Sequence, residues 1–124
     1  MTSFKRNPGD MPGIIDSAIV SDLLNRRNDK GASLFNQLVE IFFESATERI
    51  SQLKEAVGEP VRLTFVAHAF KGISRSLGAS RLGSLCHQLE TRAQSLTAAE
   101  QQQLIEEVER TFAETRIEFI RLKE

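Results

Sequence analysis

A chain of 124 residues, 40% hydrophobic and 27% charged, can bury one globular core but has no room for a second catalytic domain. The formal net charge of -1 arises from scattered charges, which argues against a basic surface for nucleic acid or an anionic membrane. Cys86 is the single cysteine, and no apolar run is long enough to span a bilayer or act as a signal peptide. We therefore expect a soluble, cytoplasmic protein without a disulfide.

Residues 1–13 contain two prolines and two glycines and show no periodicity, so they are predicted to form a flexible leader. From Ile14 onward the spacing of apolar residues is helical. Pro60 is the only proline beyond Gly13, and it stands between two strongly periodic segments. We expect residues 14–124 to form one all-α domain.

The first predicted helix is short, with Asp16 as its N-cap and its end near Arg27. Its expected apolar face consists of Ala18, Ile19, Leu23 and Leu24. The second predicted helix runs from about Ala32 to Val57, where Gly58-Glu59-Pro60 stops it. Its apolar residues recur at spacings of three and four: Phe35, Leu38, Val39, Phe42, Ala46, Ile50, Leu53 and Val57.

The third helix is predicted from about Val61 to Leu77, with Gly78 as its C-terminal cap. Ser80 is the expected cap of a fourth helix that extends to about Leu96, with an apolar stripe of Leu82, Leu85, Cys86, Leu89 and Ala93.

The sequence Thr97-Ala98-Ala99-Glu100 matches a capping box and begins the last helix, which ends near Lys123. Its predicted core residues are Leu104, Val108, Phe112, Thr115, Phe119 and Leu122. Four long helices with short connections predict an up-down antiparallel four-helix bundle with an additional short N-terminal helix. Such a bundle has no need to dimerise, so we expect a monomer.

The third helix separates into two faces at about 100° per residue. Five apolar residues lie within about 40° of the pole opposite His68: Leu63, Val66, Phe70, Ile73 and Leu77. Burying these side chains stabilises the fold by roughly 8 to 15 kcal/mol before entropy is counted. The helix is therefore expected to bury this stripe and to point His68 outward.

Five residues share the face of His68 within roughly 60°: Thr64, Phe65, Lys71, Gly72 and Arg75. Taken singly, the two cations fit an ordinary solvated surface, and Phe65 fits a residue at the edge of a neighbouring helix. Gly72 is harder to explain in this way, because glycine in an exposed helix costs about 1 kcal/mol relative to alanine. Its position one turn after His68 indicates clearance for another molecule, beside a cation at Lys71 and an apolar anchor at Phe65.

The stretch from Ala67 to Glu90, AHAFKGISRSLGASRLGSLCHQLE, resembles the signature of histidine-containing phosphotransfer (HPt) domains. In that signature His-x-x-Lys-Gly is followed by Leu-Gly and later by Leu-x-x-Leu-Cys-x-x-Leu-Glu. The match covers about a fifth of the chain, and Ile15-Asp16 and the expected bundle are also similar to the family.

The resemblance implies that His68 is the phospho-acceptor, that Lys71 stabilises the phosphoryl oxygens and that Gly72 permits close approach. Glu90 lies where the family has a glutamine or glutamate that hydrogen-bonds one ring nitrogen. The other nitrogen would attack an aspartyl phosphate on a receiver domain that supplies Mg²⁺, and the transfer would run both ways.

The implied partners are response regulator receiver domains and a sensor or hybrid histidine kinase. Thr64, Phe65 and Arg75, which share the face of His68, are expected to belong to the docking surface. The chain itself is expected to hold no cofactor or metal. Adjacent helical residues such as Cys86 and His87 diverge by about 100°, which argues against a metal site there. The sequence has no phosphate-binding loop and no Gly-rich nucleotide lid, so no autonomous ATP-dependent kinase or hydrolase activity is expected.

Three alternatives stay open. The histidine-bearing helix pair of a sensor kinase normally has an acidic residue directly after the histidine, where this chain has Ala69. The N-terminal phosphotransfer domain of a chemotaxis-type histidine kinase is a closer alternative and ranks second after an HPt domain. That group usually shows Lys-Gly-Gly, where this chain has Lys71-Gly72-Ile73. The third is a non-catalytic helical adaptor in which His68 is incidental.

Overall fold

The computed structural model describes residues 12–123, and residues 1–11 of the predicted leader lie outside them. The described residues form five α-helices, and their only β-pairing is an isolated bridge between Arg27 and Ser33. This part of the chain is all-α, as the periodicity predicts. The helices are α1 (Ser17–Asn25), α2 (Leu34–Glu55), α3 (Pro60–Ser76), α4 (Ser80–Arg92) and α5 (Ala98–Leu122).

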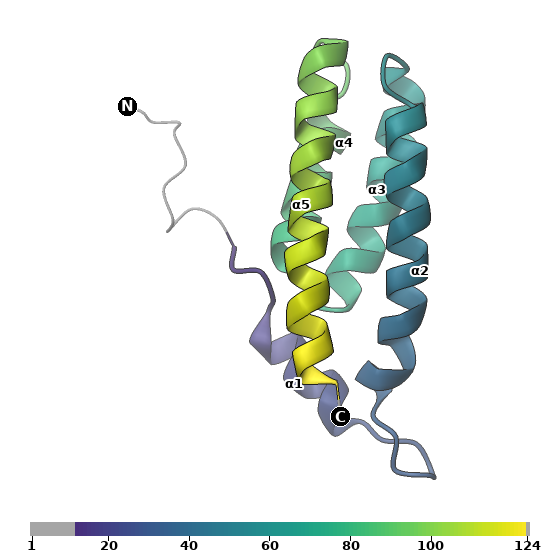
Figure 1. Cartoon of the computed structure of the whole chain (residues 1–124), viewed down its shortest axis with the longest axis vertical. Helices are drawn as coiled ribbons and strands as arrows, with labels where there is room; N and C mark the ends of the chain where they lie inside the picture. The colour runs from purple at the N-terminus through teal and green to yellow at the C-terminus, as the bar shows by residue number, and fades with distance from the viewer. Residues whose placement is uncertain (1–11, 124) are drawn as a thin grey trace.

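The four longer helices pack around a common core. α2 contacts α3 and α5, and α4 contacts the same two helices, so each helix of the four has two neighbours. Figure 1 shows α2 and α5 side by side and running in opposite directions, with α3 and α4 behind them. The short α1 packs against α2 near the end of the molecule where α5 finishes.

Phenylalanines of α2 and α5 fill much of the space between these two helices. Phe119 meets Phe35 edge-on with ring centroids 5.2 Å apart and Phe42 at 5.7 Å. Phe43, which the predicted stripe omits, is also buried, because it packs on Phe112 and under the guanidinium of Arg116. The remaining predicted core residues of α5 are buried or partly buried, together with Gln101, Ile105 and Thr111.

The predicted face of α1 is only half correct. Leu23 is buried and Leu24 packs partly buried against the core, as predicted, whereas Ala18 and Ile19 are exposed and Val20 is buried in their place. The reason is a tertiary contact. Val20 packs beside Gly78 at the turn between α3 and α4, and the backbone N–H of Asp16 donates to the carbonyl of Gly78 at 2.7 Å. These contacts fix the rotation of a helix too short to set it by its own periodicity.

Several helix ends follow the predicted chemistry. The carboxylate of Asp16 accepts hydrogen bonds from the first turn of α1, and Thr97 and Glu100 form the reciprocal capping box at the start of α5. Ser80 does not act as predicted. Ala79 occupies the N-cap position, and the Ser80 hydroxyl lies 3.4 Å from the carbonyl of Gly78 instead.

A tight turn explains the misplaced cap and also aligns α3 with α4. Gly78 has φ +82, its N–H donates to the carbonyl of Arg75, and the N–H of Ala79 donates to the carbonyl of Ser74. This is a Schellman motif, which satisfies the last carbonyls of α3 and leads directly into α4. At the far end, α4 stops at Arg92 rather than near Leu96, because the N–H groups of Ser95 and Leu96 both donate to the Arg92 carbonyl in a closing turn.

Candidate functional site

His68 lies in the middle of α3 and points away from the core. Leu63, Val66 and Phe70 are buried on the opposite side of the helix, whereas the His68 side chain is 67% exposed. The predicted stripe is correct, with Leu77 buried and Ile73 partly buried. The orientation of His68 therefore follows from the burial of this apolar face.

Glu90 of α4 joins His68 and Lys71 across the interface between α3 and α4. Its Oε2 lies 2.7 Å from Nδ1 of His68, and its Oε1 lies 2.6 Å from Nζ of Lys71. The side chains of Glu90 and Lys71 are only 20% and 16% exposed. One carboxylate thus holds a solvent-facing imidazole and the ammonium of a largely covered lysine side chain at the same time.

The contacts with Lys71 and His68 determine the protonation state of the Glu90 carboxyl group. The hydrogen bond from Lys71 is the main cause that lowers the pKa of Glu90, the hydrogen bond to His68 lowers it further, and partial burial opposes both. Glu90 is therefore an ionised carboxylate at neutral pH. Because a carboxylate only accepts hydrogen bonds, Nδ1 must carry the proton between them, and a neutral imidazole then has its lone pair on Nε2. The geometry leaves Nε2 as the ring nitrogen that is not engaged by Glu90.

Gly72 and Phe65 lie on the other side of His68 around the helix from Lys71. A Cβ added to Gly72 would meet no atom within 4 Å, so no packing contact among the described residues requires glycine there. Phe65 is 77% exposed. This flank of His68 is open and partly apolar.

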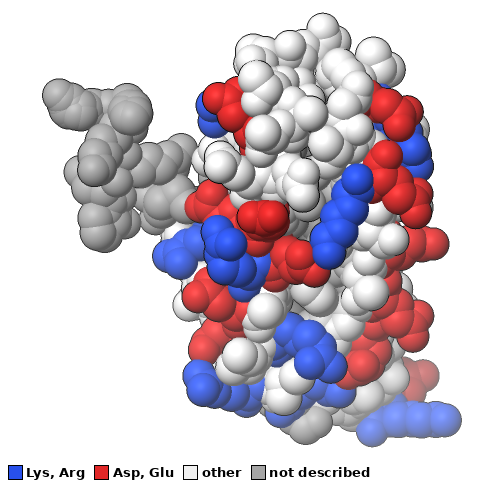
Figure 2. Space-filling model, turned by 45° about the horizontal axis from the view of Figure 1, so that its top comes forward, with Lys and Arg blue, Asp and Glu red and all other residues white. Residues whose placement is uncertain are grey.

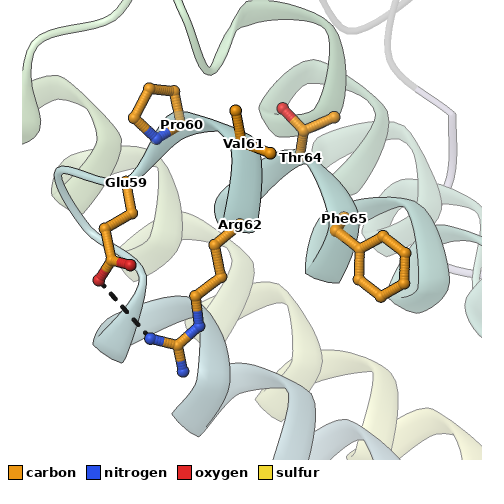
Figure 3. Close-up of a pocket in the computed structure, with 6 residues that line it drawn as sticks. All are labelled: Glu59, Pro60, Val61, Arg62, Thr64 and Phe65. Atoms are coloured by element: carbon orange, nitrogen blue, oxygen red, sulfur yellow. Dashed lines mark ion pairs between the residues drawn. The ribbon is translucent and has the colours of Figure 1, made fainter.

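Phe65 is one wall of a shallow hollow at the start of α3. Figure 3 shows Val61, Thr64 and Phe65 along these first turns, with Arg62 directed to Glu59, one of its two ion-pair partners, at 3.6 Å. Figure 2 shows that uncharged side chains gather at this end of the molecule and that charged ones lie further along it. Val61 is 76% exposed and was missed by the sequence analysis, although its place seven residues before His68 puts it about 20° from the histidine.

Two other predicted site residues are placed differently from the cluster around Glu90. Thr64 is half-buried, and its hydroxyl lies 3.5 Å from the backbone carbonyl of Glu90, so it borders the cluster without joining it. Arg75 is exposed, and its side chain runs over Gly83 of α4 rather than toward His68. Thr64 and Arg75 flank the site but do not touch the imidazole contacts described above.

Comparison with known proteins identifies what this arrangement belongs to. The family model described as Hpt domain matches residues 37–114, which is more than half of the chain and includes all of α3 and α4. This chain belongs to the Hpt domain family. Hpt domains are phosphotransfer intermediates of two-component systems, and this chain is one of them.

The crystal structure of histidine-containing phosphotransfer protein B (HptB) from Pseudomonas aeruginosa PAO1 is similar to this Hpt domain. The two are 30% identical with a TM-score of 0.75, over 88% of this chain and 93% of the HptB chain. A comparison with curated protein sequences finds no match. The likeness to HptB extends beyond the family match and includes most of the residues that the structure describes.

The Cys86-His87 pair of this Hpt domain does not form a joint site. Cys86 is fully buried in the core, and burial is the main cause that raises the pKa of its thiol to about 12. His87 is exposed on the neighbouring position of α4. Within residues 12–123 no group of three or more His, Cys, Asp or Glu side chains is placed to hold a metal ion, and no helix is long and apolar enough to cross a membrane.

Proposed function

We propose that this Hpt domain is a phosphorelay intermediate that accepts a phosphoryl group on Nε2 of His68 from a receiver-domain aspartate and passes it to the receiver of another response regulator. The observation that carries the proposal is the 2.7 Å contact between Nδ1 of His68 and the ionised carboxylate of Glu90, on a ring that is otherwise exposed. This contact selects the tautomer in which Nε2 is free to attack.

The transfer is an in-line displacement at phosphorus. The Nε2 lone pair forms the N–P bond while the bond between phosphorus and the aspartyl oxygen breaks, and the aspartate leaves as a carboxylate. Nδ1 keeps its proton, so the phosphorylated ring carries a positive charge next to Glu90. The carboxylate stabilises that charge and orients the ring, in the way that a buried aspartate supports a catalytic histidine. Glu90 is thus a positioning residue.

Lys71 is proposed to stabilise the transferred phosphoryl group. An ammonium has three donors, and the contact with Oε1 of Glu90 occupies one of them. The other donors are available for phosphoryl oxygens on Nε2, where a charge-assisted hydrogen bond is roughly twice as strong as a neutral one. Most of the transition-state stabilisation comes from the receiver domain, which supplies Mg²⁺; this Hpt domain needs no cofactor of its own.

The receiver is proposed to dock on the open flank of His68. Phe65 and the hollow beside Thr64 provide an apolar contact, and Gly72 leaves space for the receiver to approach the ring. The scaffold is an up-down antiparallel four-helix bundle of α2 to α5, acting as a cytoplasmic monomer. A sensor or hybrid histidine kinase provides the phosphoryl group upstream.

The test is phosphorylation by receiver domains that have been charged with a small-molecule phosphodonor. We expect an acid-labile, alkali-stable phosphate on the wild-type chain and none on His68→Gln. The thermal stability of this variant should change by about 0.5 kcal/mol or less, because the substituted side chain is exposed. His87→Gln, an exposed histidine on α4, is the matched control and should be labelled normally. Failure of labelling with every receiver, or labelling of His68→Gln, would refute the proposal; a helical adaptor would bind receivers and gain no phosphate.

A further inference from the structure

Gly83 occupies an unusual position for a glycine, because it is buried within α4 and its backbone does not have a positive φ. Glycine is less favourable than alanine inside a helix, so its presence here needs a reason. A Cβ on Gly83 would lie 2.8 Å from Cγ, 3.5 Å from Nε and 3.7 Å from Cδ of Arg75, and these are its three nearest neighbours. The space that a side chain would fill is therefore filled by the stem of Arg75.

The closest contact is with Cγ, near the root of the arginine side chain, and the contact continues along the stem to Nε. Cγ is only two bonds from the α3 backbone, so an alanine at Gly83 would force Arg75 out of its present rotamer. The Arg75 residue is nevertheless exposed, which means that the stem is covered by α4 while the guanidinium reaches solvent. Gly83 thus fixes the direction of a charged side chain on the surface.

Arg75 has no ion pair among residues 12–123, in contrast to the interhelical pairs of Lys54 with Glu109 and Lys123 with Glu40. Asp16 lines the same hollow as Arg75, but its carboxylate accepts hydrogen bonds from the first turn of α1. The hollow also contains Ser80 and Ser84, and Asp16 is the only acidic residue among the described residues that line it. Within residues 12–123, the positive charge of Arg75 is therefore positioned but unpaired.

The position of this charge relates it to the phosphotransfer face. Arg75 follows His68 by seven residues, which places it about 10 Å along α3 and about 20° around it. Its stem runs over Gly83 of α4, so the guanidinium is not directed at the imidazole of His68. A protein docked over His68 would also meet Arg75.

We infer that Arg75, held in place by Gly83, recognises an acidic side chain of the receiver domain and so helps to determine which receiver binds. The inference rests on the proposed function, because it requires a receiver docked over His68. A stem already ordered in the free chain loses less conformational entropy on docking. A fixed charge at the margin of an interface favours partners with an opposite charge there and disfavours those with a like charge.

The test measures binding of a receiver that transfers phosphate to His68. We expect Arg75→Ala and Gly83→Ala each to weaken the Kd about two- to fivefold at low salt, in the range of an exposed ion pair. The double variant should be no weaker than Arg75→Ala, because Gly83→Ala acts only by displacing the arginine. Each loss should disappear at high salt, where the charge is screened. Arg75→Gln, which keeps most of the stem, should match Arg75→Ala if charge is responsible.

Two controls separate this inference from the proposed function. Arg110→Ala removes an exposed arginine from α5, which packs on α2 and α4, and should leave the Kd unchanged. The rate at which phosphoramidate labels His68 should be the same in all these variants, because Arg75 is not placed on the phosphoryl group. The inference is wrong if Arg75→Ala and Arg75→Gln bind the receiver with wild-type affinity. It is also wrong if the loss of affinity in Gly83→Ala adds to that in Arg75→Ala. In either case the proposed phosphotransfer function stands as long as His68 is labelled.

Discussion

The two flanks of His68 on α3 differ in how firmly they are held. On the side of α4, Lys71 is 16% exposed and shares the carboxylate of Glu90 with the imidazole. On the other side, Phe65 is 77% exposed and Gly72 presents bare backbone. On one side of α3, the contact with Glu90 fixes the orientation of the His68 ring. On the other side, the surface around Phe65 and Gly72 is open, so another protein can reach the ring. The difference predicts that substitutions of Glu90 and Lys71 change the reaction, whereas substitutions of Phe65 and Gly72 change the encounter with the receiver.

The largest effect should come from the held flank. Glu90→Ala removes the acceptor for Nδ1, so the ring can rotate and adopt the other tautomer. We expect phosphorylation of His68 to slow roughly ten- to a hundredfold, because misplacement of a reacting group has effects of this size. The rate should fall with phosphoramidate as well as with a receiver, since the defect lies in the imidazole itself.

Glu90→Gln is the matched control for that experiment. Its amide oxygen can still accept from Nδ1 but no longer carries the charge that pairs with Lys71. We expect labelling between the rates of Glu90→Ala and the wild type. If Glu90→Ala is labelled by phosphoramidate as fast as the wild type, Glu90 does not position the ring and the contrast between the flanks fails.

The open flank is probed by Gly72→Leu. The added side chain meets nothing within the described residues but would intrude on a docked receiver. Overpacking of a close contact typically costs about 1 to 3 kcal/mol, so transfer from a receiver should slow about five- to a hundredfold. Labelling by phosphoramidate should be unchanged, and the helix should be stabilised by up to about 1 kcal/mol.

Ser51→Leu supplies the control for added bulk, because Ser51 is exposed on α2 and lies about 180° around that helix from buried Phe42. Its transfer rate should equal that of the wild type. Equal transfer rates in Gly72→Leu and the wild type would show that clearance at this position is not needed.

Much of the fold follows from the sequence because periodicity and capping are local properties. The stripe opposite His68 and the capping box at Thr97 required only residue spacing. The rotation of α1 and the cap of α4 could not be predicted in this way, because both depend on how Gly78 packs against Val20 and Asp16. Where a tertiary turn competes with a local signal such as Ser80, the turn decides.

In the candidate site too, some residues could be predicted from local spacing and others depend on tertiary packing. His68, Lys71 and Gly72 share one helix, so their common face follows from arithmetic at about 100° per residue. Glu90 comes from α4 and was assigned only through the family resemblance, since no spacing within α3 reveals which carboxylate lies opposite. The ion pair of Glu90 with Lys71 and the fit of Arg75 over Gly83 depend on the register of two helices, and nothing in the linear sequence gives that register.

The smallest expected effect concerns the stability of the fold rather than phosphoryl transfer. It tests whether the negative charge of Glu90 stabilises the contacts with Lys71 and His68. The pKa of Glu90 is lowered in the folded chain, chiefly by Lys71, relative to an ordinary glutamate value of about 4.3. The unfolded state therefore takes up its proton first as the pH falls. The stabilisation is fully present above the unfolded value and is lost as the pH falls through the folded value.

Comparison with Glu90→Gln isolates this contribution, because the other carboxylates titrate in both proteins. The difference in thermal midpoint between the wild type and the variant should be constant from pH 8 to about pH 6 and should shrink below about pH 4.3. A difference that stays constant down to pH 3 would mean that the carboxylate gains nothing from its ionisation in the fold. In that case Glu90 would hold His68 by shape alone, and the tautomer argument for Nε2 would lose its electrostatic basis.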